Sequence, residues 1–197
     1  MWRIRIGDVM RKGEGRAEVG GARAEVDLDL DGTGESDIDS GSGFLDHMIR
    51  ALARMGRIDV SAKAEGGIGP QRSRAVGLAL GSALAAALGD KKGAKRYGWA
   101  AVPMDEALAR AALDLSGRAY LVMTGEFSGD IIGDLASQDV KTILSALVEG
   151  GQMTLNVEFE GENDHHKAES VFKAVGLALK EAKKVEGTLV LSTKGVL

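Results

Sequence analysis

The string AVGLAL occurs twice in this chain, at Ala75–Leu80 and at Ala174–Leu179. Each copy lies in an apolar segment with helical spacing that follows a strand-like segment, so the repeat predicts a duplicated unit. A duplication constrains the fold strongly, because each half must contain the same elements in the same order. No low-complexity linker separates the halves. We therefore expect one domain over residues 1–197, made of two similar halves at about 1–95 and 96–197.

Residue patterns predict the elements of the first half. Arg23–Asp31 alternates apolar and acidic residues, which is typical of a half-buried strand. Phe44–Met55 has apolar residues at helical spacing, and Arg57–Ala64 is expected to be another strand. Ala75–Leu88 is apolar on most sides and contains two glycines one turn apart, which predicts a closely packed, buried helix.

The second half is expected to repeat this order. We predict a short strand at Trp99–Val102, a short helix at Asp105–Ala112 and a hairpin at Leu113–Phe127 that turns near Ser116. We then predict an amphipathic helix at Leu135–Glu149, a strand at Met153–Glu160 and a long helix at about Asp164–Val185.

Composition excludes several classes of function. The chain of 197 residues carries a net charge of −4 and contains no cysteine, which argues against a nucleic-acid-binding face and excludes disulfides and thiolate metal sites. The N-terminal residues lack the apolar core of a signal peptide, and Ala75–Leu88 is shorter than the roughly 20 residues that span a bilayer. We expect a cytoplasmic protein with no membrane or nucleic-acid partner.

An ordered set of strings resembles the imidazoleglycerol-phosphate dehydratase family from about residue 30 to the C-terminus. The strings are LDGTG (30–34), GFLDHM (43–48), LGDKKGAKRYG (88–98), PMDEAL (103–108), ALDLSGR (112–118), GENDHHKAE (161–169), FKA (172–174) and STKGVL (192–197). The resemblance implies an α+β fold with duplicated half-domains, each a β-sheet covered by helices on one face. It also implies trimers that assemble into a larger shell-like homo-oligomer.

The family's chemistry implies a metal site in this chain. The family uses two manganese ions to hold the substrate imidazole as imidazolate, while a carboxylate moves protons. Its ligands come mainly from two HHxxE motifs, and imidazole and carboxylate groups suit such ions. The second motif is present as His165, His166 and Glu169, and His47 matches a further ligand position. By the same resemblance, Glu169, His166 and Asp105 are the catalytic candidates. An acidic residue at the start of the predicted helix would also stabilise that helix.

The first HHxxE motif is absent. Pro70 and Gln71 stand in place of its histidines, and Arg74 stands in place of its glutamate. Because positive charge would then lie where the family binds cations, we predict that Arg74 or Arg72 pairs with Glu169 and replaces the metal as its counter-charge.

Three further family positions have changed. Met55 replaces the histidine of the usual RHG string, and Asn156 replaces a histidine in the strand before GEND. The glutamate of an N-terminal ET pair aligns with Gly21, where Glu18 or Glu25 could substitute.

The family's phosphate-binding residues are retained. Arg, Lys and hydroxyl groups supply the convergent donors that a phosphate requires. The resemblance assigns this role to Arg96, Arg118, Ser192, Thr193 and Lys194. A phosphorylated small molecule is therefore the expected ligand.

The sequence leaves three functions open. The first is the dehydration of imidazole glycerol phosphate to imidazole acetol phosphate in histidine biosynthesis. The second is a non-catalytic relative that binds a phosphorylated ligand or contributes to an assembly, with manganese at reduced occupancy or not bound. The third is a lyase with one metal or none, in which His165 or His166 acts as the general base.

Overall fold

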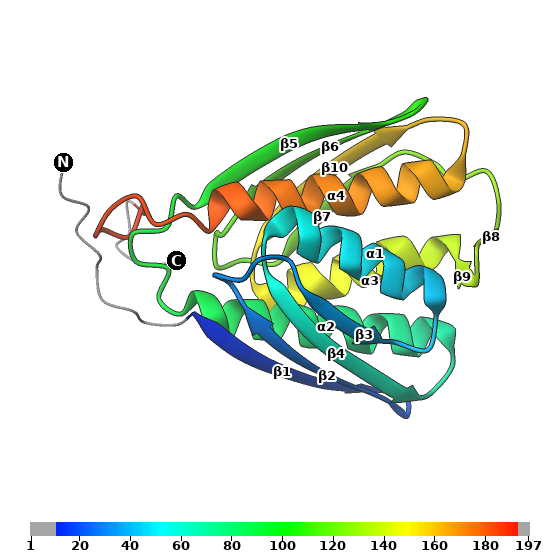
Figure 1. Cartoon of the computed structure of the whole chain (residues 1–197), viewed down its shortest axis with the longest axis horizontal. Coiled ribbons are helices and arrows are strands. Elements are labelled where there is room, and N and C mark those ends of the chain that lie inside the picture. The colour runs from blue at the N-terminus through cyan, green and yellow to red at the C-terminus, as the bar shows by residue number, and fades with distance from the viewer. Residues whose placement is uncertain (1–10, 193–197) are drawn as a thin grey trace.

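The computed structural model describes residues 11–192. Two four-stranded β-sheets enclose four helices between them (Figure 1). The first sheet and its helices comprise β1 (Lys12–Val19), β2 (Ala22–Asp29), β3 (Ser36–Asp39), α1 (Gly43–Gly56), β4 (Asp59–Gly66) and α2 (Gly69–Leu88). The second comprises β5 (Tyr97–Met104), β6 (Ala107–Asp114), β7 (Tyr120–Thr124), α3 (Ser137–Gly151), β10 (Thr154–Glu160) and α4 (Asp164–Ala182). A short ribbon of β8 (Ile131–Ile132) and β9 (Leu135–Ala136) lies before α3.

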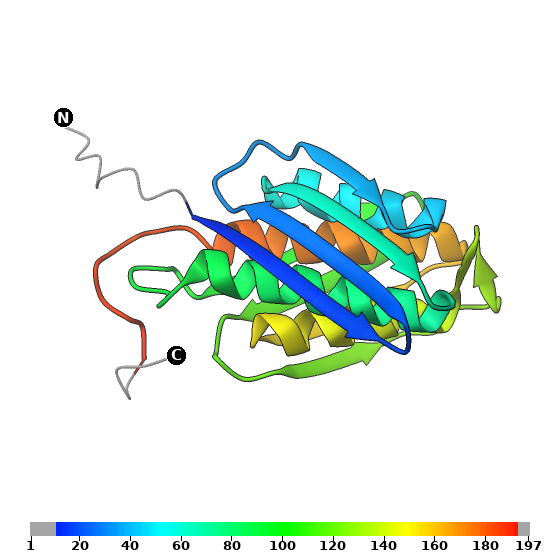
Figure 2. The ribbon, with the colours of Figure 1, turned by 90° about the horizontal axis from the view of Figure 1, so that it is seen from below.

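The two halves have the same topology, which confirms the predicted α+β fold of duplicated half-domains. The strand orders are β1-β2-β4-β3 and β5-β6-β10-β7, so corresponding strands occupy corresponding places. Helices α1 and α2 pack on one face of the first sheet, and α3 and α4 pack on one face of the second. Figure 2 shows the other face of the first sheet lying free of helices. The apolar core lies between the sheets, where α2 packs on α3 and α1 packs on α4.

The repeated AVGLAL strings lie in α2 and α4, but they do not occupy equivalent places. The first residue of α2 is Gly69 and that of α4 is Asp164. Counted from these starts, Gly81 is equivalent to Gly176. Both glycines approach the last turn of a neighbouring helix so closely that an added Cβ would meet backbone atoms, α3 for Gly81 and α1 for Gly176. The strings would instead align Gly77 with Gly176, which is one helical turn out of register. The duplication is present, but the string match does not trace it.

Two predicted elements are wrong. The segment Asp105–Ala112 is a turn followed by strand β6 and not a helix. Its alanines are good helix formers, yet the alternate residues Ala107, Ala109 and Ala111 are buried against α4, so tertiary packing decides the conformation. The hairpin at Leu113–Phe127 is also wrong, because β10 lies between β6 and β7 and pairs with both.

The remaining predicted elements are confirmed. Helix α2 begins at Gly69, well before the predicted start at Ala75, and the ends of the others shift only slightly. Strands β1, β3, β8 and β9 were not anticipated from the sequence. Among residues 11–192, no helix is both long and apolar enough to cross a membrane.

Candidate active site

Helix α1 carries His47 and is fixed at its first turn. The Ser42 side chain accepts a hydrogen bond from the Leu45 N–H and caps the helix. Asp134, from the β8–β9 turn, accepts hydrogen bonds from the Gly43 and Phe44 N–H groups at 2.7 and 3.0 Å. These bonds satisfy N–H groups that have no partner within the helix. They also hold the helix turn that presents His47.

Helix α4 carries the HHxxE motif on its first two turns. Asn163 is its N-cap and accepts hydrogen bonds from the His165 and His166 N–H groups. His165 and Glu169 lie one turn apart on the same side of α4, and this side faces α1. The motif therefore meets His47 because α1 and α4 pack side by side (Figure 1).

Three ligand atoms converge between these helices. The Oε2 atom of Glu169 lies 3.0 Å from His47 Nε2 and 3.1 Å from His165 Nε2. All three atoms lie within 4.8 Å of one another. Two imidazole nitrogens and one carboxylate oxygen form a donor set that suits a divalent transition metal. No other group of three His, Asp or Glu side chains with this spacing occurs among residues 11–192.

Lys173 contacts the opposite side of the same carboxylate. Its Nζ lies 2.7 Å from Oε1 of Glu169, one turn further along α4. The carboxylate is nine-tenths buried, and this burial raises its pKa. The Lys173 ammonium and the His47 ring lower the pKa more strongly, to about 2. Glu169 is thus ionised at neutral pH, with Oε2 directed to the histidines. Sequence reasoning missed Lys173, although its i,i+4 spacing from Glu169 was a usable signal.

The prediction that Arg72 or Arg74 pairs with Glu169 is wrong within the chain. Arg74 pairs with Glu149 on α3 at 2.8 Å. Arg72 donates to the backbone carbonyls of Gly66, Gly41 and Gly67. The counter-charge of Glu169 is Lys173, because an i,i+4 partner on the same helix reaches the carboxylate and residues of α2 do not.

His166 points away from the three-atom cluster. Its ring lies 6.2 Å from that of His165, and its Nδ1 atom lies 2.9 Å from Oε2 of Glu106. The hydrogen bond to Glu106 raises the pKa of His166, and the same bond lowers the pKa of Glu106 to about 2. Asp105 lies 3.8 Å from His166 Nε2, in the exposed turn between β5 and β6. The structure thus brings His166 and Asp105 together, but not with the other two histidines.

The predicted phosphate ligands are only partly assembled. Arg96 binds Asp114 through two hydrogen bonds of 2.7 and 3.1 Å and also donates to the Leu191 carbonyl, next to Ser192. Arg118 is exposed, and its side chain forms no hydrogen bond or ion pair with any residue from 11 to 192. Thr193 and Lys194 lie outside the described residues.

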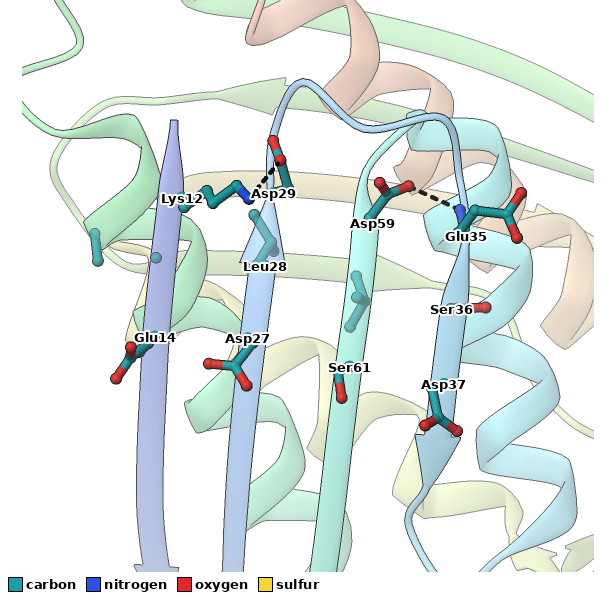
Figure 3. A pocket seen from close by; sticks show the side chains of 13 residues that line it. Lys12, Glu14, Asp27, Leu28, Asp29, Glu35, Ser36, Asp37, Asp59 and Ser61 are labelled. Carbon is teal, nitrogen blue, oxygen red and sulfur yellow. Dashed lines mark hydrogen bonds and ion pairs between the residues drawn. The ribbon is translucent and has the colours of Figure 1, made fainter. Parts of the chain in front are cut away.

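A broad hollow lies elsewhere, on the outer face of the first sheet. Its volume is about 820 Å³ (Figure 3). Figure 3 shows carboxylates from all four strands along it, including Glu14, Asp27 and Asp37. These negative charges would repel a phosphorylated ligand. Asp59 instead has a structural role, because its Oδ1 accepts hydrogen bonds from the N–H groups of residues 33–35, at the end of the LDGTG string and just after it.

The remaining substituted positions also lie apart from the cluster. Met55 is half-buried near the end of α1, and Asn156 is exposed on the outer face of the second sheet. Gly21 lies in the turn between β1 and β2.

The duplicated α+β fold brings two histidines and a carboxylate together near the first turns of two packed helices, a donor set of the kind used by metal-dependent enzymes. A model of the imidazoleglycerol-phosphate dehydratase family matches residues 40–179. The chain belongs to this family.

Relatives named imidazoleglycerol-phosphate dehydratase match most of the chain. The protein of Methanothermobacter thermautotrophicus is 44% identical over 191 residues, covering 95% of this chain and 98% of that protein. The protein of Streptococcus mutans is 47% identical, covering 82% and 86%.

Two solved structures share the fold. The dehydratase of Pyrococcus furiosus, in complex with (S)-C348, superimposes with a TM-score of 0.81 at 31% identity, covering 92% of this chain and 99% of that chain. The dehydratase of Staphylococcus aureus superimposes with a TM-score of 0.80 at 28% identity, covering 88% and 99%.

Proposed function

We propose that this chain is a hydro-lyase that dehydrates imidazole glycerol phosphate to imidazole acetol phosphate in histidine biosynthesis. The observation that carries the proposal is the convergence of His47, His165 and Glu169 in a chain of this family. The non-catalytic alternative is not favoured, because relatives that carry the enzyme's name are 44–47% identical over most of the chain.

The metal role belongs to the three converging side chains. His47 and His165 would each offer Nε2, and Glu169 would offer Oε2. Lys173 keeps that carboxylate ionised and turned to the histidines. A bound manganese ion would supply Lewis-acid stabilisation of an imidazolate. His166 retains the family's ligand position but would need partners beyond the cluster.

Proton transfer is assigned to the neighbouring acid–base groups. His166 lies between Glu106 and Asp105, and an imidazole can both accept and release a proton near neutral pH. Glu106 holds the ring through Nδ1, which leaves Nε2 on the side of Asp105. We assign proton transfer to His166 and Asp105. Glu169 would instead be a metal ligand, and the bound metal would hold the substrate imidazole.

The substrate phosphate is assigned to Arg96, Arg118 and Ser192, with Thr193 and Lys194. Arg118 supports this assignment because its guanidinium is exposed and pairs with no carboxylate of residues 11–192. Arg96 is already neutralised by Asp114, so its N–H groups would add hydrogen bonds and little net charge.

Self-association is also part of the proposal. The outer face of the second sheet exposes large side chains, with Trp99 76%, Tyr120 65% and Tyr97 54% exposed. These aromatic side chains lie on the two edge strands of the sheet, β5 and β7, and aromatic residues are enriched at protein–protein interfaces. We propose a cytoplasmic homo-oligomer of three or more copies, in which each chain is one domain with halves of about 1–95 and 96–197.

The test is turnover by protein purified from manganese-supplemented medium, with formation of imidazole acetol phosphate followed by mass spectrometry. We expect Glu169→Gln and His165→Ala to lower kcat by at least a hundredfold. The matched control is Glu149→Gln, a carboxylate on α3 paired with Arg74, which should retain activity. A wild-type chain that forms no product, or a Glu169→Gln variant that is fully active, would contradict the proposal.

A further inference from the structure

The two halves place equivalent residues at the ends of α2 and α4. Each helix follows an extended N-cap, Ile68 for α2 and Asn163 for α4. Counting from these caps makes His165 equivalent to Pro70, and Glu169 equivalent to Arg74. The close contacts of Gly81 and Gly176 with neighbouring helices give the same register independently.

The helices that pack beside them align in the same way. Helix α1 ends at Gly56 and α3 ends at Gly151, and each is followed by a residue in the left-handed conformation, Arg57 and Gln152. Counting back from these ends makes His47 equivalent to Thr142. We call His47, His165 and Glu169 the metal pole, and Thr142, Pro70 and Arg74 the closed pole.

None of the three closed-pole side chains can act as a metal ligand of the kind found at the metal pole. Pro70 has no donor atom in its side chain. The Thr142 hydroxyl donates to the Gln138 carbonyl within α3. Arg74 carries a positive charge where Glu169 carries a negative one, and a cation repels a metal ion.

Arg74 has a different task at the closed pole. Its guanidinium pairs at 2.8 Å with Glu149, which lies in the last turn of α3. It therefore ties α2 to α3, the helix pair that corresponds to α4 and α1. A protein ion pair thus links the helices of the closed pole, whereas the two helices of the metal pole are linked through ligand side chains.

One carboxyl does lie near the closed pole. Asp139 is 2% exposed in the first turn of α3, and its Oδ2 accepts a hydrogen bond from Ser73 Oγ at 3.3 Å. Burial raises the pKa of this carboxyl, which favours its neutral form. A single buried acid of this kind cannot replace a set of three ligands.

We infer that each chain binds one divalent ion, at the metal pole, and that the closed pole is a structural contact that takes no metal. The inference rests on the proposed function only in that both assign an ion to His47, His165 and Glu169. It adds that the two halves have diverged, so that the metal pole binds an ion and the closed pole holds α2 and α3 together.

The experiment is a titration of metal-free protein with Mn²⁺ by isothermal calorimetry, with elemental analysis of the protein after gel filtration. We expect about one ion per chain in the wild type and less than a tenth of an ion in Glu169→Gln and His165→Ala. Arg74→Met and Glu149→Gln, which break the closed-pole ion pair, should retain about one. Circular dichroism and thermal melting would establish that each variant is folded.

Three results would overturn the inference. Two ions per chain would mean that further ligands complete a second site. If the wild type binds no ion, the metal pole is not a metal site. If one ion remains bound in both Glu169→Gln and His165→Ala, the site lies elsewhere. Turnover distinguishes the two proposals, because one ion without product formation refutes only the proposed function, whereas product formation with two ions refutes only this inference.

Discussion

Asp134 lies 2.7 Å from the backbone N–H of Gly43, the first residue of α1, and accepts its hydrogen bond. Asp134 belongs to the β8–β9 turn of the second half, and α1 belongs to the first. The carboxylate also accepts from Ser42 Oγ, at 2.7 Å. Asp134, a residue of the second half, thus fixes the start of α1. From this helix His47 contacts Glu169, which also lies in the second half.

We expect Asp134→Ala to lower the free energy of unfolding by about 1 kcal/mol, the usual cost of losing a helix cap. Manganese affinity should also fall, because His47 lies on the released turn. Urea denaturation and calorimetry measure the two effects. Asp37→Ala is the control, since Asp37 is exposed on the first sheet and should change neither value.

The same contact has a predictable pH dependence. The hydrogen bond from Ser42 is the main reason that the pKa of Asp134 is lowered. A lowered pKa means that the stabilising contribution is present above the ordinary value of 3.8 and is lost as pH falls through the lowered one. The stability difference between wild type and Asp134→Ala should therefore shrink in acid. A difference that stays constant down to pH 2 would contradict this account.

A second contact between the halves involves a buried lysine at the end of α4. Lys183 is 7% exposed, and its ammonium donates to the carbonyls of Leu30 and of Arg57, the latter at 2.7 Å. Replacing it by Met would leave both carbonyls without this donor. We expect Lys183→Met to lower the free energy of unfolding at pH 7 by roughly 1–3 kcal/mol, the range for a buried group without a partner.

The pH profile identifies Lys183 specifically. Burial lowers its pKa from 10.5 to about 8, so between these values the unfolded chain binds more protons than the folded one. Wild-type stability, relative to Lys183→Met, should therefore rise from pH 8 to pH 10.5. Urea denaturation across this range tests the expectation, with the exposed Lys63→Met as control. Parallel curves for wild type and Lys183→Met would refute it.

The sequence predicted the duplication and the helices that carry the site, because apolar spacing and the family strings report local patterns. It did not predict β6, because the Ala-rich stretch favours a helix until packing against α4 is considered. The pairing of β10 with β6 and β7 was also missed, since strand order depends on contacts between distant residues.

The candidate site, like the fold, was predicted only in part from the sequence. His47, His165 and Glu169 were found through motif positions, and the structure brings them together. The partners of Arg74 and Glu169 were not found, because they depend on which helix faces lie opposite each other. Asp134 acts across more than eighty residues of sequence, and no local pattern indicates its role.

The outer face of the second sheet predicts the effect of one substitution on assembly. Trp99 is the third residue of β5, and the equivalent third residue of β1 is Glu14. We expect Trp99→Lys to reduce the particle mass at least threefold towards the 20.6 kDa chain, whereas Glu14→Lys leaves it unchanged. Size-exclusion chromatography with light scattering measures both. A wild-type monomer, or an undiminished mass for Trp99→Lys, would contradict the proposed interface.

Arg118 and Arg96 allow phosphate binding to be separated from folding. A hydrogen bond to a charged group contributes about 1.5–3 kcal/mol, so Arg118→Gln should raise the substrate KM by about tenfold to a hundredfold. Its melting temperature should stay unchanged, because Arg118 pairs with no residue from 11 to 192.

Arg96→Gln should raise KM and also lower the melting temperature, because it breaks the pair with Asp114. Steady-state kinetics, inhibition by inorganic phosphate and thermal melting test both variants, with Arg16→Gln as an exposed control on the first sheet. If Arg118→Gln leaves both KM and the inhibition constant of phosphate unchanged, Arg118 does not bind the phosphate.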